Sequence, residues 1–472
     1  MATLRYKKRG NKWYVYNVHQ YWDKELKKPR QKSTYLGVAD EQGGEYKKPG
    51  PRVATKIEKE IVDFGDTFSI HSVAESAKLT KIIEDTFVDV DSIMALICFQ
   101  TVEGSALYNC KDWIDGNVAK YLYKNAKTST QDISRLLKTL GRQYLQTKFF
   151  KEYTKMFFKG KRGVLLDSTA LPSSINAGIS AFGYTSSGII QNVTCLMLVD
   201  EESKLPIYFR PVGGEIADVS TLQTTVQEIK KLGVDIDKTI LDAGFFSKDN
   251  YQFLQTQKIN FVTRLPKSHN VFYEIAGQCN NLESAGNAVW YGDRVVFIQS
   301  KSVKIYGHDV FAHVILDPSK KSKDTQNILK SQDSQSLATE MIEKLDEKIK
   351  HAGVFILLSS KSIDKKEILP SYYVRQAIEQ VFGFAKCNQS ILPLRVHDEQ
   401  SIRGYLMLVF LSLIPFILLR QLLKSPTDKC LLSLRNLKAK VFDDQLIVQE
   451  PNKTTKKILN DLNIIMPTSL GI

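Results

Sequence analysis

Four side chains capable of catalytic chemistry follow a helical spacing between residues 371 and 386. Pro370 precedes this stretch, and proline is common just before or within the first turn of a helix. With about 100° between successive helical residues, one narrow stripe would carry Tyr372, Arg375, Glu379 and Lys386. The opposite, apolar side would carry Val374, Ile378, Val381 and Ala385. The pattern fits either an active-site helix or an ordinary amphipathic surface helix, and the elements around it have to decide.

Two aspartates upstream favour the active-site interpretation. Residues 163–169 and 239–244 resemble buried strands, and they carry Asp167 and Asp242 toward their carboxyl ends. If the helix of Glu379 packs beside them, three carboxylates converge without a convergent His or Cys. Such oxygen ligands suit Mg²⁺ or Mn²⁺. Two such ions can activate a water or a 3′-hydroxyl and stabilise the leaving oxygen during attack on a phosphodiester.

The strands of these aspartates belong to a longer alternation of elements. Apolar segments at 163–169, 192–199 and 205–212 are followed by a helical pattern at 220–232, a strand, a helical pattern at 248–257 and a strand at 260–264. This β-β-β-α-β-α-β order is that of a ribonuclease H-like sheet. We therefore predict an α/β core with a mixed sheet and helices on both faces. Residues 270–355 break the order with further strands and glycine turns, which predicts a β-rich insertion.

The region before the core contains two further patterns. Residues 1–48 alternate apolar and polar side chains and interleave lysines with aromatic residues, which predicts a basic β-hairpin followed by a linker at 49–51. Its aromatic residues either contact nucleic acid or belong to a small solvated sheet. Apolar residues at helical spacing between 66 and 158 predict a helical region. Short helices around 128–158 fit a DNA-binding helix-turn-helix or a plain helical bundle.

These patterns divide the chain into six predicted segments. They are a basic β-hairpin and linker (1–60), a helical DNA-binding domain (61–158), the first part of the core (159–268), the β-rich insertion (269–355), the second part of the core (356–430) and a C-terminal tail (431–472).

The net charge of the 472-residue chain is +14, which indicates a polyanionic partner, nucleic acid first. Residues 1–60 hold 15 Lys and Arg against 7 Asp and Glu, a net charge of +8. The six cysteines form no Cys-x-x-Cys pair, which suits reduced thiols in a cytoplasmic protein. We expect no signal peptide, because the N-terminus is polar and basic. The uncharged run 404–419 is short for a membrane span, so we expect a buried core helix there and no membrane association.

The spacing Tyr372-x2-Arg375-x3-Glu379-x6-Lys386 resembles the Tyr-Arg-Glu-Lys signature of DDE transposases of insertion-sequence family four. Residues 163–171 and 239–247 resemble the strands that carry the first and second aspartates of that family. The similarity spans roughly residues 66–425, and the basic N-terminus is similar to a subgroup with longer N-termini.

The resemblance implies an activity and roles for individual residues. The protein would bind double-stranded DNA at transposon ends and at a target, and a homodimer would hold two ends in a synaptic complex. Two metal ions, Mg²⁺ or Mn²⁺, would be bound by Asp167, Asp242 and Glu379. Phosphates of the transposon end would be bound by Tyr372, Arg375 and Lys386. The expected location is the bacterial cytoplasm, in association with the nucleoid.

Trp290 lies in the predicted insertion, and it is the only tryptophan there. In relatives an insertion-domain tryptophan can stack on a flipped base, so Trp290 is a candidate for DNA binding. The alternative is that its ring is packed in the core. Arg395 and His397 are weaker candidates for DNA contact.

Two other functions stay open at this point. One is a ribonuclease H-like nuclease that hydrolyses DNA without joining ends. The other is a catalytically inactive DNA-binding protein derived from a transposase. The basic N-terminal region argues against a simple nuclease, and the complete set of acids argues against an inactive protein.

Overall fold

The computed structural model describes residues 2–24, 26–48, 58–173, 178–185, 188–216, 218–330, 339–387, 394, 396 and 398–472. Its chain divides into two compact units, Met1–Lys59 and Glu60–Ile472. The linker predicted at 49–51 and the residues Arg395 and His397 lie outside the described residues.

The N-terminal unit is a three-stranded antiparallel sheet in the order β1-β2-β3. Its strands are β1 (Ala2–Arg9), β2 (Lys12–Asp23) and β3 (Lys28–Ala39). The predicted hairpin therefore has one additional strand. The first strand is rich in lysine and arginine, which do not favour strands. Its intrinsic strand propensity is therefore weak, and its pairing with β2 determines its conformation.

The larger unit is built on a ten-stranded mixed sheet in the order β11-β12-β13-β14-β10-β9-β5-β7-β6, with β8 also paired to β7. The strands are β5 (Lys161–Pro172), β6 (Ala181–Thr185), β7 (Gly188–Asp200), β8 (Pro206–Gly213), β9 (Asp235–Leu241), β10 (Asn260–Leu265), β11 (Ala288–Tyr291), β12 (Arg294–Ile305), β13 (His308–Leu316) and β14 (Val354–Ser359). The pairs β5–β9 and β9–β10 are parallel, and the others are antiparallel. The strands of the predicted insertion, β11 to β13, thus extend the sheet of the core.

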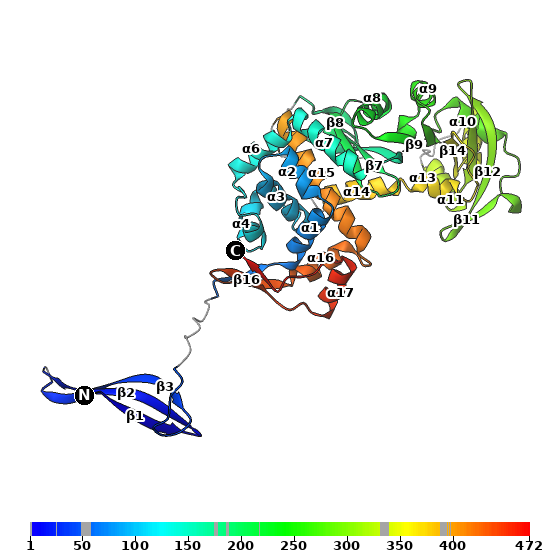
Figure 1. Cartoon of the computed structure of the whole chain (residues 1–472). Helices are drawn as coiled ribbons and strands as arrows, with labels where there is room; N and C mark the ends of the chain where they lie inside the picture. The colour runs from blue at the N-terminus through cyan, green and yellow to red at the C-terminus, as the bar shows by residue number, and fades with distance from the viewer. Residues whose placement is uncertain are drawn as a thin grey trace. The chain divides into compact units, whose positions relative to one another are not determined.

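Helices cover both faces of this sheet, as predicted (Figure 1). They are α8 (Asp218–Lys231), α9 (Lys248–Thr256), α10 (Asn270–Gly277), α11 (Pro318–Lys330), α12 (Thr339–Lys350), α13 (Ile368–Tyr373) and α14 (Gln376–Cys387). Helix α14 packs on β5 and β7, whereas α8 and α9 lie on the other side. Helix α11 occupies a stretch whose polar composition resembles a loop.

A helical region precedes the sheet in sequence. It contains α1 (Gly65–Ser76), α2 (Leu79–Thr86), α3 (Val90–Val102), α4 (Cys110–Asp115), α5 (Ala119–Leu122), α6 (Thr130–Leu140) and α7 (Gln143–Phe157). The apolar periodicity at 69–87 is that of one helix, but the structure has two. Lys78 between them adopts a left-handed conformation with φ of 58°, which ends the helical hydrogen bonding.

The long helix α15 (Glu399–Leu422) runs through this helical region and packs on α3 and α6. Gly404 makes the close approach possible, because a Cβ at this position would lie 1.8 Å from the carbonyl oxygen of Leu137. By length and composition α15 could cross a membrane, but 89% of its apolar window is buried inside the protein. That burial agrees with the expected core helix.

The C-terminal residues form a small folded layer, where a polar tail was expected. Strands β15 (Lys438–Val441), β16 (Gln445–Val448) and β17 (Ser469–Gly471) join β4 (Glu60–Asp63) in the order β17-β16-β15-β4. Helices α16 (Thr427–Arg435) and α17 (Lys453–Asp461) accompany them. Because each strand has only three or four residues and the partner of β15 lies at the other end of the unit, local sequence patterns do not reveal this sheet.

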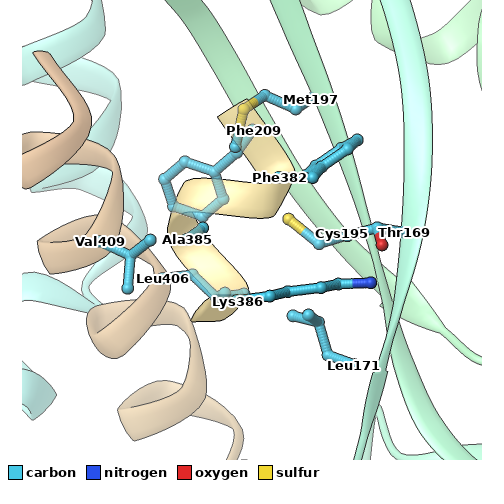
Figure 2. A pocket seen from close by; sticks show the side chains of 10 residues that line it. All are labelled: Thr169, Leu171, Cys195, Met197, Phe209, Phe382, Ala385, Lys386, Leu406 and Val409. Atoms are coloured by element: carbon cyan, nitrogen blue, oxygen red, sulfur yellow. The ribbon is translucent and has the colours of Figure 1, made fainter. Parts of the chain in front are cut away.

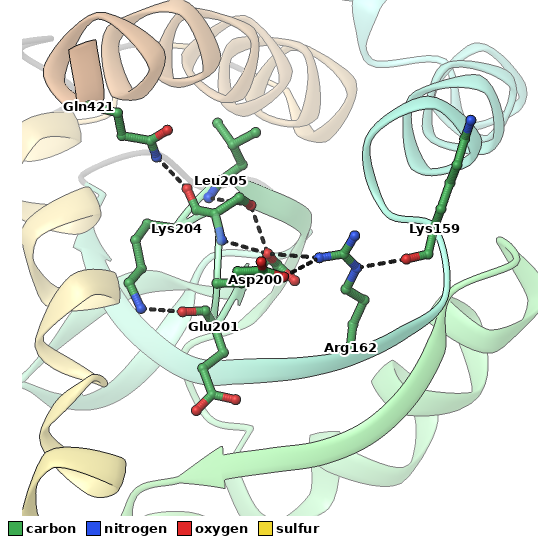
Figure 3. Close-up of polar contacts among 9 residues, drawn as sticks. Lys159, Arg162, Asp200, Glu201, Lys204, Leu205 and Gln421 are labelled. Atoms are coloured by element: carbon green, nitrogen blue, oxygen red, sulfur yellow. Dashed lines mark hydrogen bonds and ion pairs between the residues drawn. The ribbon is translucent and has the colours of Figure 1, made fainter.

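A buried charge cluster fixes the beginning of β5 to the turn between β7 and β8 (Figure 3). The Asp200 side chain is fully buried and accepts hydrogen bonds from the backbone and hydroxyl of Ser203, both at 2.7 Å. Arg162 lies 3.7 Å from the same carboxylate and donates to the carbonyl of Lys159 at 3.1 Å. Gln421 of α15 donates to the carbonyl of Ser203. These contacts connect the strand of Asp167 to the core helix.

Candidate active site

The two predicted aspartates lie side by side on neighbouring parallel strands. In the β5–β9 ladder Leu166 pairs with Leu241, so the next residue along each strand direction is an aspartate, Asp167 and Asp242 respectively. Asp167 continues β5, whereas Asp242 directly follows β9 and precedes a short 3₁₀ turn, Ala243–Phe245. Parallel strands thus bring together two acids that are 75 positions apart.

The stretch expected to be one helix is two helices. Helix α13 ends at Tyr373 and α14 begins at Gln376. At the break, backbone hydrogen bonds run over three residues instead of four, from Arg375 to Tyr372 at 3.1 Å and from Ile378 to Arg375 at 3.0 Å. The prediction that the four residues lie on one stripe of a single continuous helix is therefore wrong, because the rotation per residue changes at the break. The predicted apolar side is buried in α14, where Ile378 has no exposed surface.

The guanidinium of Arg375 lies among all three predicted acids. Its Nη1 is 2.8 Å from Asp167 Oδ2, and its Nη2 is 2.8 Å from Glu379 Oε1 and 3.9 Å from Asp242 Oδ1. Tyr372 is buried, and its hydroxyl donates a hydrogen bond of 3.3 Å to Asp242. Five of the seven candidate residues are thus connected in one network.

Within the described residues no three His, Cys, Asp or Glu side chains stand close enough together to bind a metal ion as they are arranged. A single cation, the guanidinium of Arg375, lies among Asp167, Asp242 and Glu379.

Burial raises the pKa of Asp167 from its ordinary value of 3.8 to about 6, although the charge of Arg375 and the backbone N–H of Ser168 lower it. The negative charges of Asp242 and Asp218 contribute to the increase. The pKa of Tyr372 is also raised, first by burial and then by the charge of Asp242. Burial is therefore the main reason why both side chains favour their neutral forms.

Asp218 is a fourth carboxylate next to the site, and the sequence analysis missed it. It is the first residue of α8, its carboxylate is hydrogen-bonded to the side chain of Ser168, and burial raises its pKa. In the sequence it resembles any acidic residue in a first helical turn, so no local signal distinguishes it.

Lys386 approaches the sheet at a different place from Arg375. Its side chain extends from α14 toward β5 and β7, where it lines a small, mostly apolar cavity with Thr169 and Cys195 (Figure 2). Asp167 and Thr169 alternate on β5, so Lys386 lies on the same face of the sheet but farther along the strand. Burial raises the pKa of the Cys195 thiol to about 12, while the nearby charge of Lys386 lowers it.

Trp290 is on β11, the edge strand of the sheet, and its side chain is 76% exposed. Packing in the core, the alternative left open by the sequence, is therefore excluded. The next residue, Tyr291, stacks on Tyr373 of α13 with ring centroids 5.4 Å apart. Because Tyr373 directly follows Tyr372, this contact fixes the strand of Trp290 to the helix that reaches Asp242.

A polar hollow of the surface lies beside the acids, and two additional cations line it. Arg264 at the end of β10 and Lys320 on α11 both lie over the ring of Phe355, at 5.4 and 5.6 Å from its centroid. Burial and the charge of Arg264 lower the pKa of Lys320. The two like charges face the same hollow as Glu379, an arrangement suited to an anion.

Comparison with known proteins shows the family to which the chain belongs. A family model described as transposase DDE domain matches residues 158–414, which is more than half of the chain. The protein therefore belongs to the DDE transposase domain family. The match includes all three acids and supports DNA transposition as its class of activity. The part of the chain before residue 158, including the N-terminal unit, lies outside the match.

Other comparisons add little. No curated protein matches the chain. The chain is similar to a solved piggyBac transposase, in a structure described as a synaptic complex with hairpin DNA, at 12% identity and a TM-score of 0.39. The similarity covers 84% of this chain and 70% of the other. This degree of similarity is too low to establish a common fold.

Proposed function

We propose that the protein is a DNA transposase that binds the terminal inverted repeats of its insertion sequence and catalyses phosphodiester hydrolysis and strand transfer. The observation that carries this proposal is the convergence of Asp167, Asp242 and Glu379 on one guanidinium in a DDE-family chain. The strand order supports a ribonuclease H-like core, since β8, β7 and β5 are antiparallel neighbours while β9 and β10 continue parallel to β5. The signature residues favour insertion-sequence family four.

The donor set fits a hard divalent cation. Three carboxylates from different elements already point at one positive charge, and they offer only oxygen ligands. We assign Asp167, Asp242 and Glu379 as the residues that would hold Mg²⁺, or Mn²⁺, in two positions. Bound there, the ions would supply activation of the attacking oxygen and stabilisation of the leaving oxygen.

The other residues would position the DNA. Tyr372 orients the carboxylate of Asp242 through its hydrogen bond. With cations held by the acids, the guanidinium of Arg375 would be available for a backbone phosphate, for which its planar fork is suited. Lys386 supplies a second charge farther along β5. Trp290, exposed on the edge strand, would stack on a base of the transposon end.

The expected partners are double-stranded transposon ends and target DNA, with a homodimer in the synaptic complex. The net charge of +14 supports a polyanionic partner. A bacterial protein of this kind would act in the cytoplasm, on the nucleoid.

The test is a strand-cleavage and strand-transfer assay on duplexes that carry the inverted repeats flanking the gene, with Mg²⁺. We expect wild type to cleave and join ends and Glu379→Gln to do neither. Glu399→Gln is the matched control, because Glu399 also pairs at 2.8 Å with an arginine four residues away, Arg403, but lies outside the site. It should keep wild-type activity.

The outcome also separates the alternatives. Cleavage without joining would identify a nuclease, and binding without cleavage would identify an inactive DNA-binding protein. Equal activity of Glu379→Gln and wild type would show that the acids are assigned wrongly.

A further inference from the structure

The register of the N-terminal sheet determines which side chains share a face. In the β1–β2 ladder Arg5 pairs with Tyr16 and Lys7 pairs with Tyr14, and directly paired residues lie on the same face. In the β2–β3 ladder Tyr16 pairs with Tyr35. Arg9 follows Lys7 at the next alternate position of β1. The surface so formed, called the tyrosine face below, includes the cations Arg5, Lys7, Arg9 and Lys12 and the aromatic residues Tyr14, Tyr16 and Tyr35.

The opposite face is partly covered by residues 40–48. Lys47 pairs with Val38 through backbone hydrogen bonds of 3.1 and 2.9 Å. Gly37 lies so close to this segment that a Cβ there would be 2.0 Å from the carbonyl oxygen of Lys47. Val15, on that side, has no exposed surface, and the hydroxyl of Tyr6 donates to the carbonyl of Gly44. On the tyrosine face, by contrast, the side chains of Arg5, Lys7, Arg9 and Tyr35 are exposed.

Cations and aromatic rings are in contact across the tyrosine face. The amino group of Lys7 lies 5.5 Å from the ring centroid of Tyr16, and the guanidinium of Arg9 lies 6.0 Å from that of Tyr14. The Tyr35 ring is 5.5 Å from Tyr16 and 6.1 Å from Tyr14. These contacts hold the long basic side chains in an ordered row along β1, with about 6.6 Å between alternate positions.

The distribution of acids is asymmetric. Residues 1–48 contain 12 Lys and Arg but only 5 Asp and Glu. By the ladder register, no acidic residue among the described strand pairs of this unit lies on the tyrosine face; Asp23 pairs with Lys28 on the opposite face. The face is therefore basic, and it combines its charges with tyrosine hydroxyls that can donate to phosphate oxygens.

We propose that the tyrosine face is a second DNA-binding surface, which docks on the phosphate backbone of duplex DNA outside the DDE domain. The inference rests on the proposed function for its choice of partner, since a transposase must hold DNA ends. Three cations at alternate positions of an edge strand neutralise successive phosphates, and the tyrosines position them. An extended strand is also a shape that DNA grooves accept.

The experiment measures binding of the full-length chain to a fluorescent 30-base-pair duplex of arbitrary sequence, in EDTA, over a series of salt concentrations. The test variant combines Arg5→Gln, Lys7→Gln and Arg9→Gln. The matched control combines Lys28→Gln, Arg30→Gln and Lys32→Gln, which removes three exposed cations from the other edge strand on the opposite face. Circular dichroism and thermal melting check that both variants fold.

The test variant should bind DNA at least about tenfold more weakly near 0.1 M salt. The slope of its log affinity against log salt concentration should be smaller by about 2–3, because each lost phosphate contact reduces this slope by about 0.9. The control should retain the wild-type slope within about one unit. Equal losses in both variants would mean that the unit is a non-specific basic arm, and no loss in either would mean that it does not bind DNA. Both results overturn the proposal.

Failure of this inference is distinguishable from failure of the proposed function. Binding in EDTA requires no catalysis, so a protein that binds through this face but cleaves nothing would refute only the proposed activity. A protein that cleaves and joins ends with an unchanged salt slope in the test variant would refute only the docking surface.

Discussion

Replacement of Arg375 by glutamine tests the central contact of the site. The Arg375 and Asp167 side chains are each only 15% exposed, whereas Glu379 is 51% exposed. Removing one partner of a buried ion pair typically lowers the free energy of unfolding by about 3–5 kcal/mol. Because both side chains are still partly exposed, we expect Arg375→Gln to lower it by about 3 kcal/mol at pH 8. Most of this loss comes from Asp167, because water can solvate the freed Glu379.

The loss should depend on pH in a defined direction. The pKa of Asp167 is raised from 3.8 to about 6, so this carboxyl lowers stability progressively as the pH rises from about 4 to 6. Without Arg375 its pKa rises further. At pH 5 the group is mostly neutral in both proteins, so the difference in the free energy of unfolding should fall to about 1 kcal/mol or less.

Urea unfolding of the metal-free protein in EDTA, at pH 5 and pH 8, measures this difference. The matched control is Arg403→Gln, which removes a 2.8 Å pair with Glu399 at the same helical spacing but at higher exposure. It should cost about 0.5 kcal/mol or less at either pH. Addition of Mn²⁺ at pH 8 should stabilise Arg375→Gln more than wild type, because the metal no longer competes with the guanidinium. Equal destabilisation of Arg375→Gln at both pH values, or equal stabilisation by Mn²⁺, would refute this reasoning.

Three further predictions concern other parts of the site. Protons should compete with Mn²⁺ for Asp167, so the Mn²⁺ affinity measured by calorimetry should fall as the pH drops below about 6 and should vary little between pH 7 and 8; a flat profile would exclude Asp167 as a ligand. Ile378→Asp places a charge where no surface is exposed and should abolish strand cleavage, while Ile378→Val should retain most of it; activity in Ile378→Asp would mean that α14 docks differently. Trp290→Ala should leave the melting temperature nearly unchanged, because the side chain is 76% exposed, but should reduce cleavage by about tenfold if stacking contributes 1–3 kcal/mol. A lower melting temperature with normal cleavage would indicate a structural role instead.

The parts of this fold that follow from local pattern were predictable. Continuous runs of apolar residues indicated β5, β7, β8, β9 and β10, and the order of these elements indicated a mixed sheet with helices on both faces. Ser129, whose hydroxyl accepts from the backbone of Asp132, and Gly141 after the last residue of α6 marked the bounds of that helix.

Features that depend on distant pairing were not predictable. The partner of β15 is β4, more than 370 positions away, and strands of four residues carry too little periodicity to identify such a pair. The break between α13 and α14 has no proline or glycine to announce it, and both halves retain their apolar residues. Asp218 approaches Asp242 only because α8 begins over the ends of two strands, which is a property of the tertiary structure.

The raised pKa of Asp167 is consistent with the proposed metal dependence. An aspartate 2.8 Å from a guanidinium ordinarily has a lowered pKa, yet that of Asp167 is about 6. Burial is the largest cause, and the one positive charge is shared with Asp242 and Glu379 at 3.9 and 2.8 Å. A divalent cation held by the three carboxylates would add positive charge beside Asp167, and its binding would be favoured above pH 6, where this carboxyl is ionised.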